Sequence, residues 1–463
     1  MNALRVLLAA LAPGIPGASP PDEPPNFVFI NIDDLGYADI GPFGSGLNRT
    51  PHLDRLAAEG RLLKCVYAAP VCTPSRASLL TGCYPKRVGL PNVLFPGNKT
   101  GIHDGEHTLP EILKARGYAT GCVGKWHLGD QPDFLPTRHG FDAYFGIPYS
   151  NDMGPAEDGA RSSLGDRPPA SKGPGHPPLP LLRDGKVVER VRAQEQTTLV
   201  SRYTEEAVAF LRRNRHRRFF LYLAHNAVHF PIYPGKDFQG KSKNGLYGDW
   251  VEEVDWSVGR VMDVLRELDL DDRTLVIFTS DNGGTSRAVN RPLRGYKGST
   301  LEGGMRVCTI ARWPGKIPAG TATDEMITHM DFLPTFAGLA GGTLPRPVDG
   351  KDVRPLLEGR PGAKTPHEGF AFFKGDRLEA VRTGPWKLEL NSGKLYNLDE
   401  DVGESRDLSA GNAEIVKRLR EYAERVRSDL GDAGRGPGCR PAGHVEDARP
   451  IIARDGTVRE DFR

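Results

Sequence analysis

The chain has 463 residues, 38% hydrophobic and 26% charged, which is typical of a soluble globular protein with one large and one smaller domain. Its net charge of +2 argues against a protein that binds nucleic acid or a membrane surface through charge. No apolar run approaches the roughly 20 residues of a membrane-spanning helix, so we expect no membrane span.

The N-terminus is typical of a secretory signal. Arg5 precedes a short apolar run, and small residues and prolines follow around Ala18 and Ser19. We therefore expect a signal peptide over residues 1–20 and a secreted or periplasmic protein, or a lysosomal one in a eukaryote. A disordered tail is the alternative, because the apolar run is short and has no clear cleavage site.

Continuous apolar runs and helical patterns alternate along the chain. Apolar runs without alternation suit strands that are covered on both faces, so the pattern predicts an α/β domain with a parallel sheet between helices. In chain order we expect a strand at 26–34, helices at 50–60 and 108–117, a strand at 118–129, a helix at 198–214, and strands at 219–231 and 274–284.

Residues 71–82, VCTPSRASLLTG, predict a helix that begins near Cys72, because Pro74 suits a first turn and Gly82 a stop. A cysteine at a helix N-terminus beside an arginine predicts an unusually acidic thiol. From the residues alone, Cys72 could bind a metal, form a disulfide with Cys83, act as a nucleophile or be converted into another group.

The large domain is expected to span residues 24–340. Residues 151–197 are rich in proline, glycine and charge, and predict an irregular loop insertion. Residues 341–432 predict a smaller α+β subdomain with short antiparallel strands and an amphipathic helix at 412–430. Residues 433–463 are expected to form a flexible tail.

Oxygen-bearing side chains follow two of the expected strands. They are Asp33 and Asp34 after the first strand, and Asp281 and Asn282 after the last. Because the carboxyl ends of parallel strands meet at one edge of a sheet, we expect these four side chains to lie together. Such ligands, without a zinc-type cysteine or histidine cluster, suit Ca2+ or Mg2+. The simpler interpretation is that each pair caps a turn.

Basic side chains are expected at the same edge. Lysines and arginines beside a divalent metal suit a substrate that is a tetrahedral oxyanion. The alternative is a solvated basic surface with its histidines packed in the core. The candidates are Arg76, Lys125, His127, His229 and Lys297.

These segments resemble the type I sulfatases. CTPSR at 72–76 matches their C-x-P-S-R signature, and GKWHLG at 124–129 matches their second signature. Further blocks (NIDDLGYADIG, DNGG, KGSTLEGGMR and GKLYNLDEDVGESRDL) follow the family's order and are most similar to arylsulfatase A and N-acetylgalactosamine-6-sulfatase. The resemblance implies an alkaline-phosphatase-like large domain, with a mixed, mostly parallel sheet between helices. It also implies a smaller C-terminal domain with an antiparallel sheet and a helix.

The resemblance implies a use for Cys72. In sulfatases a formylglycine-generating enzyme oxidises this cysteine to Cα-formylglycine, and the proline and arginine of the motif belong to its recognition sequence. One hydroxyl of the hydrated aldehyde attacks the sulfur of a sulfate ester, and deprotonation of the other expels sulfate. A sulfated carbohydrate is the implied natural substrate, with aryl sulfates cleaved in vitro.

The resemblance also implies a role for each site residue. Asp33, Asp34, Asp281 and Asn282 match the ligands of Ca2+, which is favoured over Mg2+, and the modified Cys72 completes the metal's shell.

Among the other matched residues, Arg76 holds the hydrated aldehyde and His127 takes the proton of its second hydroxyl. The remaining matches contact sulfate, and the last two also help to protonate the leaving alcohol: Lys125, Ser150, His229 and Lys297.

Other functions fit part of these features. A phosphonate monoester or phosphodiester hydrolase of the same superfamily uses the same aldehyde and fold. A cysteine hydrolase would use Cys72 as a thiolate nucleophile but would need no metal-type ligands. A non-catalytic sulfated-glycan-binding protein would have no reason to keep the maturation motif.

Overall fold

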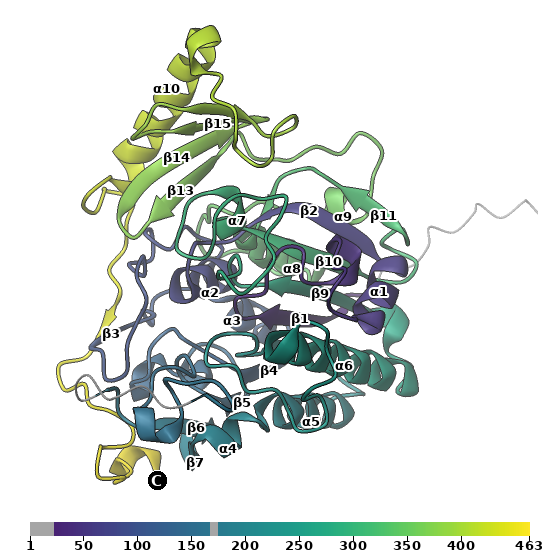
Figure 1. The fold of residues 1–463 in the computed structure, drawn as a ribbon, viewed down its shortest axis with the longest axis vertical. Coiled ribbons are helices and arrows are strands. Elements are labelled where there is room, and N and C mark those ends of the chain that lie inside the picture. The colour runs from purple at the N-terminus through teal and green to yellow at the C-terminus, as the bar shows by residue number, and fades with distance from the viewer. Residues whose placement is uncertain (1–22, 167–174) are drawn as a thin grey trace, which may run out of the picture.

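Four of the expected strands lie side by side at the centre of a large sheet (Figure 1). The computed structural model describes residues 23–166 and 175–463, so the expected signal peptide at 1–20 lies outside the described residues. The central strands run parallel in the order β9 (Thr274–Ser280), β1 (Asn26–Ile32), β8 (Phe219–Ala224) and β4 (Ala119–Gly124).

Outer strands extend this centre to 11 strands and make the sheet mixed. On one side β10 (Arg306–Arg312) runs antiparallel between β9 and β2 (Arg61–Tyr67), and β11 (Thr321–Thr323) and β12 (Ile327–Thr328) pair with β2. On the other side β5 (Ala143–Gly146) runs parallel to β4. The mixed, mostly parallel sheet is therefore confirmed.

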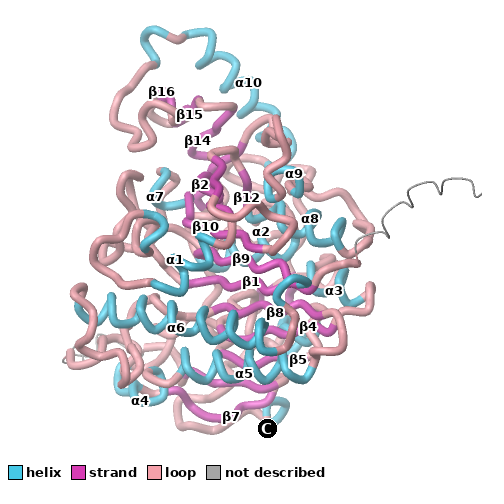
Figure 2. The backbone as a smooth tube through the Cα atoms, turned by 90° about the vertical axis from the view of Figure 1, so that its right-hand side faces the viewer, coloured by secondary structure: helices cyan, strands magenta, loops and turns pink. Residues whose placement is uncertain are grey.

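Helices cover both faces of the sheet, because successive side chains of a strand point to opposite faces (Figures 1 and 2). On β1, Val28 and Ile30 pack into one core, and Phe27 and Phe29 into the other. The first core is covered by α1 (Pro51–Ala58), α5 (Leu199–Arg213) and α6 (Gly245–Glu267), and the second by α2 (Cys72–Thr81), α3 (Leu109–Lys114) and α8 (Phe332–Leu339).

The helices expected at 50–60, 108–117 and 198–214 are confirmed as α1, α3 and α5. The long helix α6 is not predicted, because the glycines and lysines around its start indicate an exposed loop. Its buried face also includes acidic residues. The carboxylates of Glu253 and Asp255 accept hydrogen bonds from the backbone N–H groups of Gly235 and Leu53.

Glu253 makes the stability of the fold sensitive to pH. Burial raises the pKa of its carboxyl from 4.5 to about 8. Since the folded-state pKa is the higher one, this stabilisation is complete below about pH 4.5 and is lost as the pH rises through 8. Between about pH 6 and pH 9, wild type should lose about 2 kcal/mol more stability than Glu253→Gln. Urea unfolding at both pH values measures this, and an equal loss in both proteins would contradict it.

The second half of the 151–197 segment is not the expected irregular loop. β6 (Leu179–Arg183) and β7 (Lys186–Val191) form a hairpin, and α4 (Ala193–Gln196) follows. β6 pairs antiparallel with β5 and so lengthens the main sheet. The charged residues within 183–190 belong to this edge hairpin, and the leucine side chains of β6 are buried.

The C-terminal part contains the expected antiparallel sheet and helix. β13 (Phe370–Lys374), β14 (Arg377–Thr383), β15 (Trp386–Glu389) and β16 (Leu395–Asn397) form a meander. The helix α10 (Ala413–Leu430) packs its apolar face on this sheet (Figure 1). The short helices α7 (Glu302–Met305) and α9 (Arg354–Leu357) precede this sheet in the chain.

Residues 433–463, here called the C-terminal strap, pack on the large domain where a flexible tail is expected. β17 (Gly443–His444) pairs with β3 (Thr100–Gly101). Arg440 donates two hydrogen bonds of 2.7 Å to Glu106, and Ile451 and Phe462 are buried. Figure 1 shows the strap, in yellow, running from α10 back along the main sheet domain.

The Phe462→Ala variant should lose about 3 kcal/mol of unfolding free energy, because the buried ring fills space that alanine leaves empty. Urea unfolding measures the loss, and the exposed neighbour Glu460→Ala serves as the control. A Phe462→Ala protein as stable as wild type would show that the strap contributes no packing.

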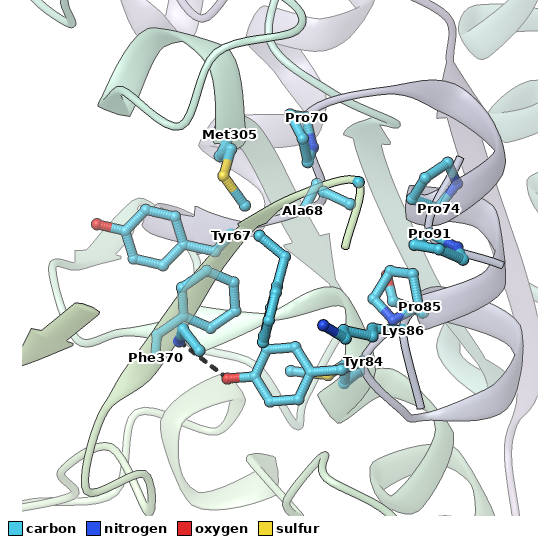
Figure 3. A pocket seen from close by; sticks show the side chains of 16 residues that line it. Tyr67, Ala68, Pro70, Pro74, Tyr84, Pro85, Lys86, Pro91, Met305 and Phe370 are labelled. Carbon is cyan, nitrogen blue, oxygen red and sulfur yellow. Dashed lines mark hydrogen bonds between the residues drawn. The ribbon is translucent and has the colours of Figure 1, made fainter. Parts of the chain in front are cut away.

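An apolar crevice joins the motif helix α2 to the C-terminal sheet (Figure 3). Pro74 on α2 faces Met305 and Phe370 across it, and the Ala371 N–H donates a hydrogen bond of 3.0 Å to the Tyr84 hydroxyl. Its cavity volume of about 20 Å³ is close to that of one water molecule. The crevice is therefore a packing contact that supports the helix beginning at Cys72.

Candidate active site

The polar residues that end the four central strands converge at one edge of the sheet. Asp33 and Asp34 follow β1, and Asp281 follows β9, next to it in the sheet. The backbone pairing continues past the strand ends, since the Asp281 N–H donates to the carbonyl of Ile32 at 2.8 Å. Asp34 has a φ of 64°, a left-handed conformation that aspartate tolerates, and the turn brings two successive carboxylates into one site.

The helix α2 places Cys72 and Arg76 one turn apart and facing this edge. The Cys72 Sγ lies 3.3 Å from Asp33 Oδ1 and 3.3 Å from Lys297 Nζ. Arg76 donates to Asp281 Oδ2 from two nitrogens, at 3.1 and 2.9 Å. All six cysteines are free, so Cys72 forms no disulfide with Cys83.

The thiol of Cys72 is not acidic, and that prediction is wrong. Burial raises its pKa well above the ordinary value, and the neighbouring Asp33 carboxylate raises it further. Lys125 and Lys297 lower it by less than burial raises it. Since the thiolate is the nucleophilic form of cysteine, this environment argues against a cysteine hydrolase.

Each carboxylate of the site is paired with a cation. Lys125 Nζ lies 2.5 Å from Asp33, Lys297 Nζ 2.7 Å from Asp34, and Arg76 2.9 Å from Asp281. Burial acts to raise the pKa of Asp33, but the surrounding cations, Lys125 foremost, hold it well below its ordinary range. Burial and the charge of Asp33 raise the pKa of Asp281 to about 6. Asp33 and Asp281 are therefore ionised near neutral pH.

Oxygen atoms gathered here fit a hard cation. Ligand atoms of Asp33, Asp34, Cys72 and His229 all lie within 4.8 Å of one another, so this buried group within the described ranges could hold a metal ion. Asn282 lies against it, since its Nδ2 donates to Asp34 Oδ1 at 2.8 Å while its buried Oδ1 has no partner among the described residues. Carboxylate and amide oxygens are ligands that Ca2+ prefers.

Of the five sequence-predicted metal ligands, Asp281 lies beside this group without belonging to it. Its Oδ1 accepts from the Asp34 N–H at 3.3 Å, and its Oδ2 is held by Arg76. His229, predicted as a catalytic and sulfate-binding residue, has a ring nitrogen within the group. The resemblance alone does not indicate this histidine as a ligand.

His229 and Lys297 lie on the open side of the site. Their side chains are 11% and 18% exposed, whereas those of Arg76 and Lys125 are fully buried. The Ser150 hydroxyl accepts from Lys125 Nζ at 3.1 Å and lies 3.3 Å from His229 Nδ1. A substrate that enters from solvent therefore meets His229 and Lys297 first.

Within the described part of the chain, His127 has no hydrogen bond or ion pair with the site's carboxylates. Its ring bonds the carbonyl of Leu94 at 3.1 Å. Burial, with Lys125 and Arg76, lowers its pKa well below the ordinary value, so the ring is neutral. Thr73, which bonds the backbone of both His127 and Leu94, is a site residue that the sequence does not indicate. No signal could have found it, because the motif leaves its position open.

Comparisons with known proteins show the family to which the chain belongs. Residues 25–342 match the sulfatase family model, and residues 297–429 match the model of the C-terminal region of N-sulphoglucosamine sulphohydrolase. N-acetylgalactosamine-6-sulfatase of Canis lupus familiaris is 40% identical over 409 residues, which cover 83% of this chain and 74% of that protein. Arylsulfatase A of Homo sapiens is 38% identical over 472 residues, which cover 91% and 90%.

Solved structures show the same fold. The crystal structure of Ps i-CgsB is 32% identical with a TM-score of 0.75, and the match covers 87% of this chain and 93% of that one. The PsFucS1 sulfatase from Pseudoalteromonas sp. is 25% identical with a TM-score of 0.78, and the match covers 88% and 90%. The chain therefore belongs to the sulfatase family and is a sulfuric ester hydrolase.

Proposed function

We propose that this sulfatase removes sulfate from a sulfated carbohydrate, using a Cα-formylglycine formed from Cys72 and a bound Ca2+. Similar proteins support the substrate class, since they include N-acetylgalactosamine-6-sulfatase and a 31% identical structure of Ps i-CgsB in complex with k-i-k-neocarrahexaose. Aryl sulfates are the proposed laboratory substrates, as the name of the similar arylsulfatase A suggests.

The observation that carries this proposal is the position of the Cys72 side chain between Asp33 and Lys297. A thiol with a raised pKa is a poor nucleophile there. Oxidation to the aldehyde, followed by hydration, would place hydroxyl oxygens at the same point, next to a carboxylate and an ammonium group. Bound Ca2+ would supply positive charge that stabilises an ionised hydroxyl and the sulfate oxygens.

Side chains on the open side of the site would bind the sulfate group and protonate the leaving alcohol. The Nδ1 of His229 donates to the carbonyl of Phe230 at 2.6 Å, so its Nε2 is the ring atom that exchanges a proton with the leaving oxygen. Lys297 and Lys125 would donate hydrogen bonds to sulfate oxygens, with Ser150 placed by its bond to Lys125. Arg76 would hold the hydrated aldehyde from the same helix.

Peptide mass spectrometry of the segment containing Cys72 tests the proposal, on protein made together with a formylglycine-generating enzyme. We expect residue 72 to have lost one sulfur and two hydrogens and gained one oxygen. An unmodified thiol in fully active enzyme would overturn the proposal. Rates with a sulfate, a phosphate and a phosphonate ester of one aryl alcohol then separate a sulfatase from the phosphonate hydrolase alternative.

We also propose that the protein is exported, to the periplasm or the outside of the cell, or to the lysosome in a eukaryote. The support is the charge and apolar pattern of residues 1–20. None of the helices in the described part of the chain has the length and apolar character needed to cross a membrane. N-terminal sequencing of the mature protein would test export by locating the cleavage site.

A further inference from the structure

The hydrogen bond of His127 determines which ring nitrogen carries its proton. The Nε2 lies 3.1 Å from the carbonyl oxygen of Leu94. A carbonyl can only accept, so Nε2 must donate, and in the neutral ring Nδ1 then carries the lone pair. This Nδ1 is buried and has no hydrogen-bond partner among the described residues. The atom able to take a proton is therefore Nδ1.

Thr73 bonds the backbone of both residues in the His127–Leu94 contact. Its hydroxyl donates to the backbone carbonyl of His127 at 2.9 Å and accepts from the backbone N–H of Leu94 at 3.2 Å. Thr73, Leu94 and His127 thus form a closed ring of hydrogen bonds. The threonine is fully buried, so water does not compete for its hydroxyl.

Neither partner of Thr73 belongs to a helix or strand. Leu94 lies in the irregular stretch 90–99, and His127 has a φ of 66°, which a residue with a side chain adopts only at a cost. Thr73 itself lies in the first turn of α2, which begins at Cys72. The helix therefore offers a fixed attachment point for two segments that lie outside helices and strands.

We propose that Thr73 is a positioning residue for sulfate release: its hydroxyl keeps the Leu94 carbonyl against His127 Nε2, so that Nδ1 stays free to take a proton. This inference rests on the proposed function, in which His127 is the base during sulfate release. The C-x-P-S-R motif leaves this second position open, so the role follows from the geometry and not from the motif.

Three variants test the inference. Thr73→Val removes the hydroxyl and keeps the branched shape, whereas Thr73→Ser keeps the hydroxyl. Thr81→Val is the matched control, because Thr81 is also buried on α2 but its hydroxyl donates to Ala77 of the same helix, at 2.7 Å. Each protein is made with the maturation enzyme, and its rate is divided by the fraction of Cys72 converted.

For an aryl sulfate, Thr73→Val should lower kcat by about tenfold and KM by a similar factor, so that kcat/KM stays nearly unchanged. The aryl alcohol should appear in a burst before the steady state, because ester cleavage precedes the slowed sulfate release. Thr73→Ser should recover kcat to within about threefold of wild type, and Thr81→Val should show no burst. A wild-type kcat in Thr73→Val, or a loss without a burst, would overturn the inference.

A second measurement does not depend on the folding of any variant. NMR of wild-type enzyme labelled with ¹⁵N-histidine should show protonated Nε2 and unprotonated Nδ1 for His127. The opposite tautomer would overturn the inference. Steady turnover of aryl sulfate by the wild-type enzyme tests the proposed function. The burst and the tautomer test the positioning role of Thr73, so the proposed function and this role can fail separately.

Discussion

The Cys72→Ala enzyme should hydrolyse aryl sulfates at least about 1,000-fold more slowly than wild type. Alanine can be neither oxidised to the aldehyde nor hydrated, so the oxygen nucleophile placed between Asp33 and Lys297 is lost. Steady-state rates with a nitrophenyl sulfate measure the effect. The fold should survive, because the substitution removes one sulfur atom whose neighbours keep their own pairings with Lys125 and Asp34.

Cys83→Ala is the matched control for this result. Cys83 is also a free, buried cysteine and directly follows the end of α2, but its Sγ accepts from Arg440 at 3.5 Å, away from the site. This variant should keep its activity. If Cys72→Ala retains a tenth of wild-type activity, residue 72 is not the source of the nucleophile.

Removal of divalent cations by a chelator should abolish activity, by at least about 100-fold, and Ca2+ should restore it. The melting temperature should fall by only about 5 °C or less, because the site's charged side chains already balance one another. They pair Asp33 with Lys125, Asp34 with Lys297, and Asp281 with Arg76. A bound dication gives the site the excess positive charge that a sulfate ester needs.

Activity, melting temperature and metal content should be measured on the same samples. Asp34→Asn is the informative variant, because it removes one negative charge from the candidate metal site while keeping a side-chain oxygen that could bind Ca2+. It should need a higher Ca2+ concentration for half of its maximal activity. Full activity in enzyme shown by elemental analysis to hold no divalent metal would contradict the Ca2+ proposal.

The centre of the fold could be predicted because its elements are defined by local pattern. Continuous apolar runs, such as the one in β8, are stable only between two helical layers, and their parallel ends must share one edge. That logic places Asp33, Asp34, Asp281 and Asn282 together without any coordinates, as the structure shows. The motif helix could be predicted as well, from its proline and its closing glycine.

Features that depend on distant contacts could not be predicted. The strap has few apolar residues, and Ile451 and Phe462 become buried only where the strap folds back on a much earlier part of the chain. The pKa of Cys72 depends on burial, which the motif does not reveal and which outweighs its position at a helix N-terminus. The place of His229 next to Asp33, Asp34 and Cys72 depends in the same way on the position of β8 beside β1 in the sheet.

Because of the C-terminal strap, the C-terminal sheet is not a separate terminal domain. Because the polypeptide enters this sheet from the main domain and returns to it afterwards, the sheet is an insertion with two covalent attachments. A chain shortened after Leu430 would expose part of the main core and would not be a clean domain truncation. A tag fused after Arg463 would emerge beside the β6–β7 hairpin, where Lys186 contacts Asp461, at the far end of the molecule from α10 (Figure 1).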